Sequence, residues 1–149
     1  MPEINAAYLV NAWKELHTNI NHLRDIYATY NEVIQRYGFT AQKEYGISTR
    51  IHAPFLTPKG WSTQDRDQLI EIIGKSGISV AKQFACQSQL LSLKSDCKVS
   101  RNTANRVITL PTGGGLSKQS LNHVKDQLGS CIEKVNAKVT ESDLVEFVS

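Results

Sequence analysis

The sequence predicts an α+β fold, in which helices cover one side of a small sheet and a long helix stands at the N-terminus. Apolar residues at helical spacing over 2–37 predict the long helix. Short runs of β-branched residues at 46–56, 78–80 and 106–111 predict the strands. Helical spacing returns after 117. The chain has 149 residues and no internal repeat, so we expect a single domain over 1–149.

One stripe of apolar side chains organises the first 37 residues. Its members recur at alternating steps of four and three: Leu9, Trp13, Leu16, Ile20, Leu23, Tyr27, Tyr30, Ile34 and Tyr37. A helix of this length runs about 50 Å, longer than a compact domain of this size needs. Gly38 suits its left-handed end. We expect the part near 37 to cover the sheet and the end at 1–13 to dock on a second chain, through a surface of Leu9, Trp13, Leu16 and Ile20.

The predicted strands are separated by a helix. Residues 46–56 alternate apolar and polar side chains, and Pro54 limits this strand to an edge or an end. Ser62 or Thr63 caps a helix that ends at 75–77. Residues 78–80 form a second strand, and 106–111 form a third that ends at proline. The order is therefore strand, helix, strand, with the third strand further along the chain.

The remaining segments are predicted to be helical. Residues 87–98 form a short helix or a packed loop, and Ser100 caps a helical turn that runs to Asn105. Ser117 caps a helix whose apolar residues continue to Val135. Residues 136–140 break this helix, and 141–148 form a last short one.

Two places in the sequence are candidates for anion contacts. Arg50 and His52 would share one face of the first strand, although a solvated sheet face is the simpler explanation. Glycines at 113–115 precede Ser117 and Lys118, and glycines before a helix N-terminus can bind phosphate. This segment has neither the spacing nor the Lys-Ser order of a Walker motif, so a flexible turn before a helix cap is the simpler interpretation.

Composition excludes several classes of protein. A net charge of +3 with scattered basic residues gives no support for nucleic-acid binding. No apolar run approaches the length of a membrane-spanning helix, and the N-terminus lacks the pattern of a signal peptide, so we expect a cytoplasmic protein without a membrane association. The three cysteines are in no metal-binding pattern and indicate reduced thiols, with a nucleophile or metal ligand as the alternative. They are Cys86, Cys97 and Cys131.

Four segments together carry a family resemblance. They are MPEINAA at 1–7, LRDIYATY at 23–30, RDQLIEIIGKSGI at 66–78 and NRVITLP at 105–111 with the following Leu116, Ser117 and Val124. In this order the segments resemble sugar aminotransferases of the DegT/StrS type, fold type I enzymes that depend on pyridoxal phosphate. The resemblance covers the chain from Met1 to about Leu128.

The resemblance implies the small C-terminal domain of such an enzyme. Residues 1–37 would be the helix that joins the two domains, and 38–149 the small α+β domain. The family's catalytic lysine, its aspartate facing the pyridine nitrogen and its phosphate-binding loops lie in the large domain, upstream of the segment that matches Met1. We therefore expect no catalytic, cofactor-binding or metal-binding residue in this chain and no cofactor bound by it alone. After Gly77 many members carry a His-Tyr type pair, where this chain reads AKQF at 81–84.

Two functions remain open from the sequence. The chain is the small domain of a split or truncated sugar aminotransferase, which acts in polysaccharide or amino-sugar biosynthesis and is inactive alone. Alternatively it is a non-catalytic assembly module that self-associates as a dimer or binds a full-length aminotransferase. The partner is then a copy of the chain or a separate large-domain chain, held through the N-terminal helix. A freestanding enzyme that uses Arg50, His52, Lys82 or a cysteine has less support, because nothing in the sequence places these residues together.

Overall fold

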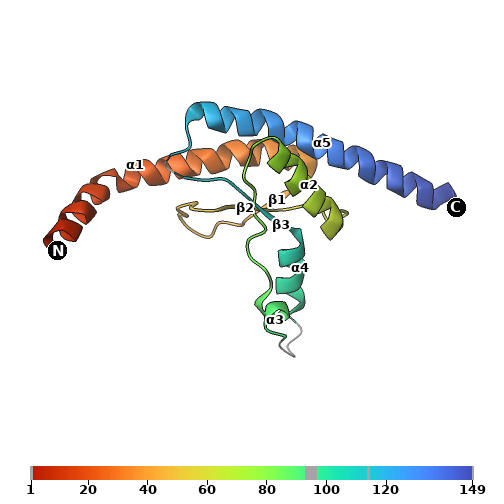
Figure 1. Cartoon of the computed structure of the whole chain (residues 1–149), viewed down its shortest axis with the longest axis horizontal. Coiled ribbons are helices and arrows are strands. Elements are labelled where there is room, and N and C mark those ends of the chain that lie inside the picture. Colours follow the sequence, from red (N-terminus) through yellow and green to blue (C-terminus); the bar gives the residue numbers. More distant parts are fainter. Residues whose placement is uncertain (1, 93–96, 114, 149) are drawn as a thin grey trace.

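The fold is α+β, as the sequence predicts (Figure 1). The computed structural model describes residues 2–92, 97–113 and 115–148. The elements in chain order are α1 (Pro2–Ile34), the 3₁₀ turn η1 (Gln35–Tyr37), β1 (Thr40–Ala41), β2 (Ala53–Leu56), α2 (Thr63–Lys75), α3 (Gln87–Leu90), α4 (Lys98–Arg106), β3 (Val107–Leu110) and α5 (Lys118–Val148).

The sheet is antiparallel, and its two faces have different surroundings. The strand order is β1-β2-β3, with Ala53 opposite Leu110 and Phe55 opposite Ile108. Ala53 and Phe55 are buried against α1, α2 and α5, whereas the alternate residues of β2 are half-buried on the other face. In Figure 1, α1 and α5 lie side by side on one side of the sheet, and α3 and α4 extend on the opposite side. The prediction that helices cover one side of the sheet is confirmed.

The long first helix is buried only near its C-terminal end. The buried residues all lie in its last three turns: Ile26, Tyr27, Tyr30, Val33 and Ile34. The Tyr30 hydroxyl donates to the Pro111 carbonyl at 2.9 Å and so ties α1 to the end of β3. Burial raises the pKa of Tyr30 to about 12. Gly38 follows η1 with φ 77°, the left-handed end that the sequence predicts.

The strand predicted over 46–56 is shorter in the structure. Only Ala53–Leu56 forms β2, and Ile47 and Ile51 are exposed in the preceding loop. Arg50 adopts a left-handed backbone with φ 55°, which a continuous strand cannot contain. The sequence also missed β1, because two residues are too few to show an alternating pattern.

Three further predictions about elements are wrong. Residues 78–80 form no strand, and the segment meets the sheet only through a bridge between Ala81 and Thr109. Helix α4 begins at Lys98, so Ser100 lies in its first turn and does not cap it. Helix α5 continues through 136–140, where Asn136 accepts a hydrogen bond from Trp61 Nε1 at 3.2 Å. The predicted short helix at 87–98 is seen as α3, and 93–96 of that range lie outside the described residues.

Helix α2 begins where the sequence predicts and is held by a reciprocal cap. The Ser62 hydroxyl accepts a hydrogen bond from the Asp65 amide at 3.2 Å, and the Asp65 carboxylate accepts from the Ser62 amide at 2.7 Å. The cap satisfies amides of the first turn that have no partner within the helix.

Replacing the capping hydroxyl tests this local anchor. We expect Ser62→Ala to lower the free energy of unfolding by about 1 kcal/mol, because the first-turn amide loses its acceptor. Urea denaturation followed by circular dichroism measures the change. Ser79→Ala, at an exposed serine outside the helices, is the matched control and should change stability by less than about 0.5 kcal/mol. Equal effects of the two variants would contradict a role for the cap.

Candidate functional site

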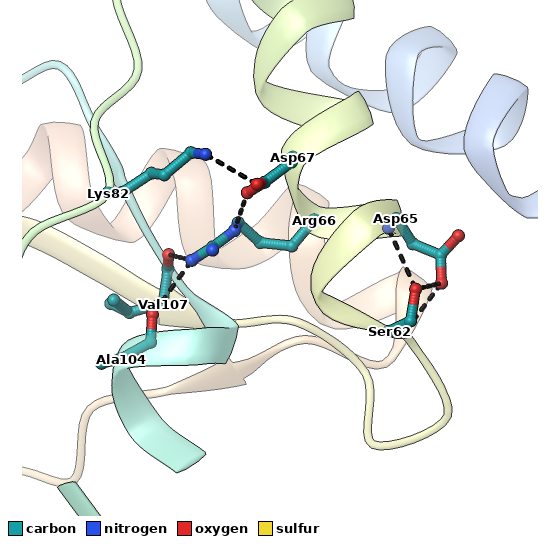
Figure 2. Close-up of polar contacts among 7 residues, drawn as sticks. All are labelled: Ser62, Asp65, Arg66, Asp67, Lys82, Ala104 and Val107. Atoms are coloured by element: carbon teal, nitrogen blue, oxygen red, sulfur yellow. Dashed lines mark hydrogen bonds and ion pairs between the residues drawn. The ribbon is translucent and has the colours of Figure 1, made fainter. Parts of the chain in front are cut away.

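A buried arginine in the first turns of α2 connects this helix to α4 and β3. Arg66 is 5% exposed, and its Nη1 donates to the carbonyl oxygens of Ala104 at 3.0 Å and Val107 at 3.2 Å (Figure 2). These carbonyls lie where α4 ends and β3 begins, so a helix end that lacks partners of its own receives a donor. The contact fixes α4 and β3 relative to α2.

We call the contacts of Arg66 with Ala104, Val107 and Asp67 the Arg66 junction. Asp67 extends this junction to the segment after α2. Its carboxylate accepts from Arg66 Nε and forms an ion pair with Lys82 Nζ at 2.7 Å (Figure 2). Burial alone would raise the pKa of the Asp67 carboxyl, but the hydrogen bonds and charges of Lys82 and Arg66 outweigh it and hold the pKa below its usual value. The junction therefore connects α2, the α4–β3 turn and the chain around Lys82.

A cleft of about 1040 Å³ lies on the sheet face that the long helices leave uncovered. Its floor is formed by the outward residues of β2 and β3, among them Pro54, Leu56 and Thr109. Its walls are residues 83–88 and one side of α4. The exposed surface of the lining is mostly apolar, although about half of the lining residues carry polar side chains, among them Gln42, Gln83 and Ser100. The Arg66 junction holds both walls in place.

The structure separates Arg50 from His52. Arg50 is 7% exposed, its guanidinium lies 3.9 Å from the centre of the Tyr27 ring, and its Nη2 pairs with Glu44 at 2.9 Å. The hydrogen bond from the Ser48 amide and that from Arg50 lower the pKa of Glu44. His52 instead lines the cleft, where its ring meets Phe84 edge-on at 6.2 Å. The idea that the two residues share a strand face is wrong, because the chain turns at Arg50.

The second candidate anion site lies at the start of α5. Ser117 Oγ accepts from the Ser120 amide at 3.0 Å, so this serine caps the helix as predicted. Lys118 is exposed in the first turn. Gly114 of the preceding turn lies outside the described residues. Anion binding at Arg50, His52, Ser117 or Lys118 stays a prediction.

The predicted docking surface is exposed over its first half. Trp13 is 72% exposed and Leu9 is exposed to a similar degree. Leu16 is only 36% exposed, and Ile20 is half-buried. Exposure therefore falls along one stripe towards the sheet. In Figure 1 this part of α1 extends beyond the other elements, at the opposite end of the molecule from the C-terminal part of α5.

The cysteines lie in three different settings. Cys86 is buried, with its sulfur 3.0 Å from Ser88 Oγ, and it shares the cleft lining with Cys97. Cys131 is buried on α5, with its sulfur 3.8 Å from Ser76 Oγ. Residues 2–92, 97–113 and 115–148 contain no cluster of histidine, cysteine and carboxylate side chains suited to a metal. Within the same residues no helix is long and apolar enough to cross a membrane.

Sequence reasoning missed the arginine junction and the cleft. A signal for the junction was present, because Arg66 falls three and seven residues before Leu69 and Ile73 on the buried face of α2. A charged residue in that position needs buried partners. No signal for the cleft was present, since its walls come from segments far apart in the chain.

The fold and its sequence have known relatives. The fold is shared with part of a sugar aminotransferase, Spr1654 from Streptococcus pneumoniae, at a TM-score of 0.73 and 17% identity over 85% of this chain and 34% of that chain. TlmJ from Streptoalloteichus hindustanus gives 0.73 and 12% identity over 83% and 34%. PseC from Helicobacter pylori, an aminotransferase involved in the biosynthesis of pseudoaminic acid, gives 0.69 and 16% over 84% and 36%.

The sequence itself defines the family. The family model described as the DegT/DnrJ/EryC1/StrS aminotransferase family matches residues 1–129. The chain belongs to this family, as its four motif segments indicate. It spans about a third of the length of the solved structures that it resembles. No curated protein sequence matches it.

The described clefts of this chain lack the lysine that a pyridoxal phosphate site uses. Spr1654 has been solved in a form that carries this cofactor. An aminotransferase holds pyridoxal phosphate through a lysine inside a shaped site. No lysine is among the described residues that line the cleft under the sheet, the hollow between Ile78 and α5, or the hollow between α1 and Arg50. Lys75 and Lys82 are engaged by Glu71 and Asp67 at the surface.

Removing the buried guanidinium tests the junction. We expect Arg66→Met to lower the free energy of unfolding by about 3 kcal/mol, because the Ala104 and Val107 carbonyls lose their shared donor. Urea denaturation gives the value. Arg36→Met is the matched control, since Arg36 forms only an exposed pair with Glu32 on α1, and it should change stability by less than about 1 kcal/mol. A loss no larger than that of the control would show that the junction is dispensable.

The lowered pKa of Asp67 predicts an acid-sensitive contribution to stability. A carboxyl whose folded pKa lies below its unfolded value stabilises the fold above pH of about 4, and this contribution is lost as pH falls through the folded pKa. Asp67→Asn should therefore flatten the fall in unfolding free energy below about pH 4. Denaturant titrations at several pH values measure the slope. Asp126→Asn, on an exposed position of α5, is the control, and an identical slope in both variants would refute the assignment.

Proposed function

We propose that this chain is the small domain of a sugar aminotransferase that transfers an amino group to a nucleotide-linked sugar. It acts with a large domain that supplies the catalytic lysine and pyridoxal phosphate, and it is inactive alone. Two findings support this proposal. The chain belongs to the family, and its fold matches about a third of the length of the solved sugar aminotransferase Spr1654. The reaction serves the synthesis of an amino sugar or of a polysaccharide that contains one, in the cytoplasm.

The exposed half of α1 carries the proposal. The same stripe that is buried at Tyr27, Tyr30 and Ile34 continues outward through Leu16 and Trp13 to Leu9 without a change of spacing. A lone domain gains nothing from an apolar stripe held in water, and such a surface usually marks an interface. The large domain is either a separate chain or part of the same longer polypeptide.

Reconstitution tests the proposed function. The chain is mixed with a candidate large-domain polypeptide encoded beside it, and amino transfer to a nucleotide-linked keto sugar is followed in the presence of pyridoxal phosphate. We expect activity from the mixture and none from either chain. The double variant Leu9→Ser with Trp13→Ser should abolish both the complex and the activity, because it removes the centre of the exposed stripe.

The control variant is Val99→Ser. Val99 is 82% exposed on α4 and lies outside the stripe, so its replacement removes an equally accessible apolar side chain and should leave the activity unchanged. Circular dichroism verifies that all variants are folded. The proposal is refuted if no large-domain polypeptide restores activity, whether it is added as a separate chain or joined to the N-terminus of this chain.

The exposed stripe also supports a second candidate function. Its steps of four and three are the spacing at which two helices pack side by side, so a second copy of the chain is a suitable partner. The chain would then be an assembly module that forms a dimer or binds a full-length aminotransferase. Sedimentation equilibrium separates the possibilities: a dimer lost in the Leu9 and Trp13 double variant favours self-association, and a stable monomer excludes it.

A further inference from the structure

We propose that the hollow between α1 and Arg50 receives an extended backbone segment of the large domain, and that the loop beside the hollow packs against the same domain. The loop is the segment at 42–52, which joins β1 to β2, and we call it the β1–β2 loop. The inference rests on the proposed function, which supplies the large domain as the partner. It adds a second contact to the one made by the exposed half of α1.

The hollow has a volume of about 490 Å³, and its charges are balanced. Its loop side is formed by Glu44 and Arg50, which pair with each other at 2.9 Å. On α1, the exposed Arg24 and Asp25 have opposite signs, and the other described lining residues are uncharged. An ion that entered this balanced site would lack a counter-charge, whereas a neutral peptide group needs none.

Two buried polar atoms of α1 have no hydrogen-bond partner beside this hollow. They are Tyr27 Oη and Asn31 Oδ1, and both residues are part of the lining. The Gln42 amide approaches the Tyr27 hydroxyl, but the amide is itself a donor and cannot accept the hydroxyl proton. Burial raises the pKa of Tyr27, so the hydroxyl keeps its proton and remains a donor. The hollow therefore offers a donor and an acceptor that the domain leaves unused.

A single extended residue matches this donor and acceptor. Tyr27 and Asn31 are four positions apart on α1, so their side chains lie on the same face of the helix. An extended residue presents its own N–H and C=O groups towards the same neighbouring element. The C=O would accept from the Tyr27 hydroxyl, and the N–H would donate to Asn31 Oδ1. Both atoms are then paired, as buried polar atoms in proteins usually are.

The β1–β2 loop carries three large apolar side chains that face water. Tyr45 is 93% exposed, Ile47 is 85% exposed and Ile51 is 61% exposed. In Figure 1 the loop runs out from the sheet on the side of the view where the N-terminus lies. Several large apolar side chains gathered on one exposed segment are typical of an interface.

The backbone of this loop is held in place before any partner binds. The Glu44 carboxylate accepts from the Ser48 amide at 2.7 Å and from Arg50 Nη2 at 2.9 Å. The Arg50 guanidinium in turn lies 3.9 Å from the centre of the Tyr27 ring. A segment that is already ordered loses less conformational entropy when a partner covers it.

The hollow continues the line of the exposed stripe on α1, which selects the large domain as the occupant. Leu9 and Tyr27 are 18 residues apart, as are Trp13 and Asn31, and 18 residues make five turns of 3.6 residues. Each pair therefore points in the same direction from the helix axis. A domain seated on Leu9 and Trp13 reaches the hollow by extending along one face of α1. The solved relatives are about three times as long as this chain, so they contain a body of that size.

Binding of the large-domain polypeptide used in the reconstitution tests the inference. The affinity of the chain and of its variants is measured by isothermal titration calorimetry. We expect Tyr27→Phe to weaken the complex about tenfold, because one hydrogen bond to the segment is lost. The variant keeps the ring that stacks on Phe55 at 5.0 Å and removes only an unpaired hydroxyl, so the stability of the isolated chain should not fall.

Tyr30→Phe is the matched control and should show the opposite pattern. The Tyr30 hydroxyl donates to the Pro111 carbonyl inside the domain, so its removal should lower the stability of the isolated chain and leave the affinity unchanged.

A second variant tests the β1–β2 loop. Ile47→Asp should weaken the complex at least about tenfold, because it places a charge in an apolar contact. The side chain is exposed, so the isolated chain should fold normally, as circular dichroism verifies. Val99→Asp, at a similarly exposed position of α4, is the control and should leave the affinity unchanged.

Hydrogen exchange replaces the titration where the large domain is joined to this chain. We expect amides of the β1–β2 loop to exchange more slowly in the joined polypeptide than in the isolated chain, because the large domain covers the loop. Tyr27→Phe and Ile47→Asp should each reduce this protection, and the two control variants should not.

Three results would overturn the inference. The first is a complex or joined polypeptide in which Tyr27→Phe and Ile47→Asp change neither affinity nor protection. The second is a dimer of the isolated chain that Ile47→Asp dissociates, because the surface then belongs to a second copy. The third is the absence of any complex, which refutes the proposed function as well.

The remaining outcomes separate the two proposals. Amino transfer by a complex that is insensitive to Tyr27→Phe and Ile47→Asp would refute this inference and leave the proposed function standing. A complex that both variants weaken but that transfers no amino group would refute the proposed function and support the interface.

Discussion

The structure depends on a buried guanidinium placed where three elements meet. Arg66 satisfies carbonyls at the α4–β3 turn, and through Asp67 it reaches Lys82 on the segment that borders the cleft. A buried charge is tolerated only with such a set of partners, so the positions of all three elements are coupled to one side chain. The Ser62–Asp65 cap sets the start of the helix that carries it.

The two faces of the sheet have different roles: one forms the core and the other forms the floor of the cleft. One face is packed against α1, α2 and α5 and provides stability through residues such as Phe55, Ile108 and Leu128. The other face is left open and forms the floor of the cleft. Because neighbouring strand residues point to opposite faces, each short strand contributes to both the core and the cleft. The long helix belongs to the first face at one end and leaves the domain at the other.

Particular residues show which elements can be predicted from the sequence alone and which cannot. The spacing from Leu9 to Tyr37, the glycine at 38 and the cap at Ser62 were sufficient to predict α1 and α2, because these signals depend on residues within a few turns. The strand at 46–56 was overextended because Arg50 is held in its turn by Tyr27 and Glu44, contacts that no local pattern contains. Residues 136–140 were predicted to break the helix, but α5 continues through them, and the Asn136 side chain accepts a hydrogen bond from Trp61, 75 residues earlier.

By itself the sequence determined the family, the α+β class and the apolar stripe that extends past the domain, since motifs and periodicity are properties of short segments. Only the tertiary structure decided which part of the stripe is exposed, that Arg50 and His52 lie apart, and that Gln83, Phe84 and His52 line one cleft. The physical reason is that burial and the meeting of distant side chains depend on contacts between segments that are not neighbours in the chain. The role of Arg66 depends on both sequence and tertiary structure. Its spacing places it on the buried face of α2, and the fold supplies the carbonyls that accept its hydrogen bonds.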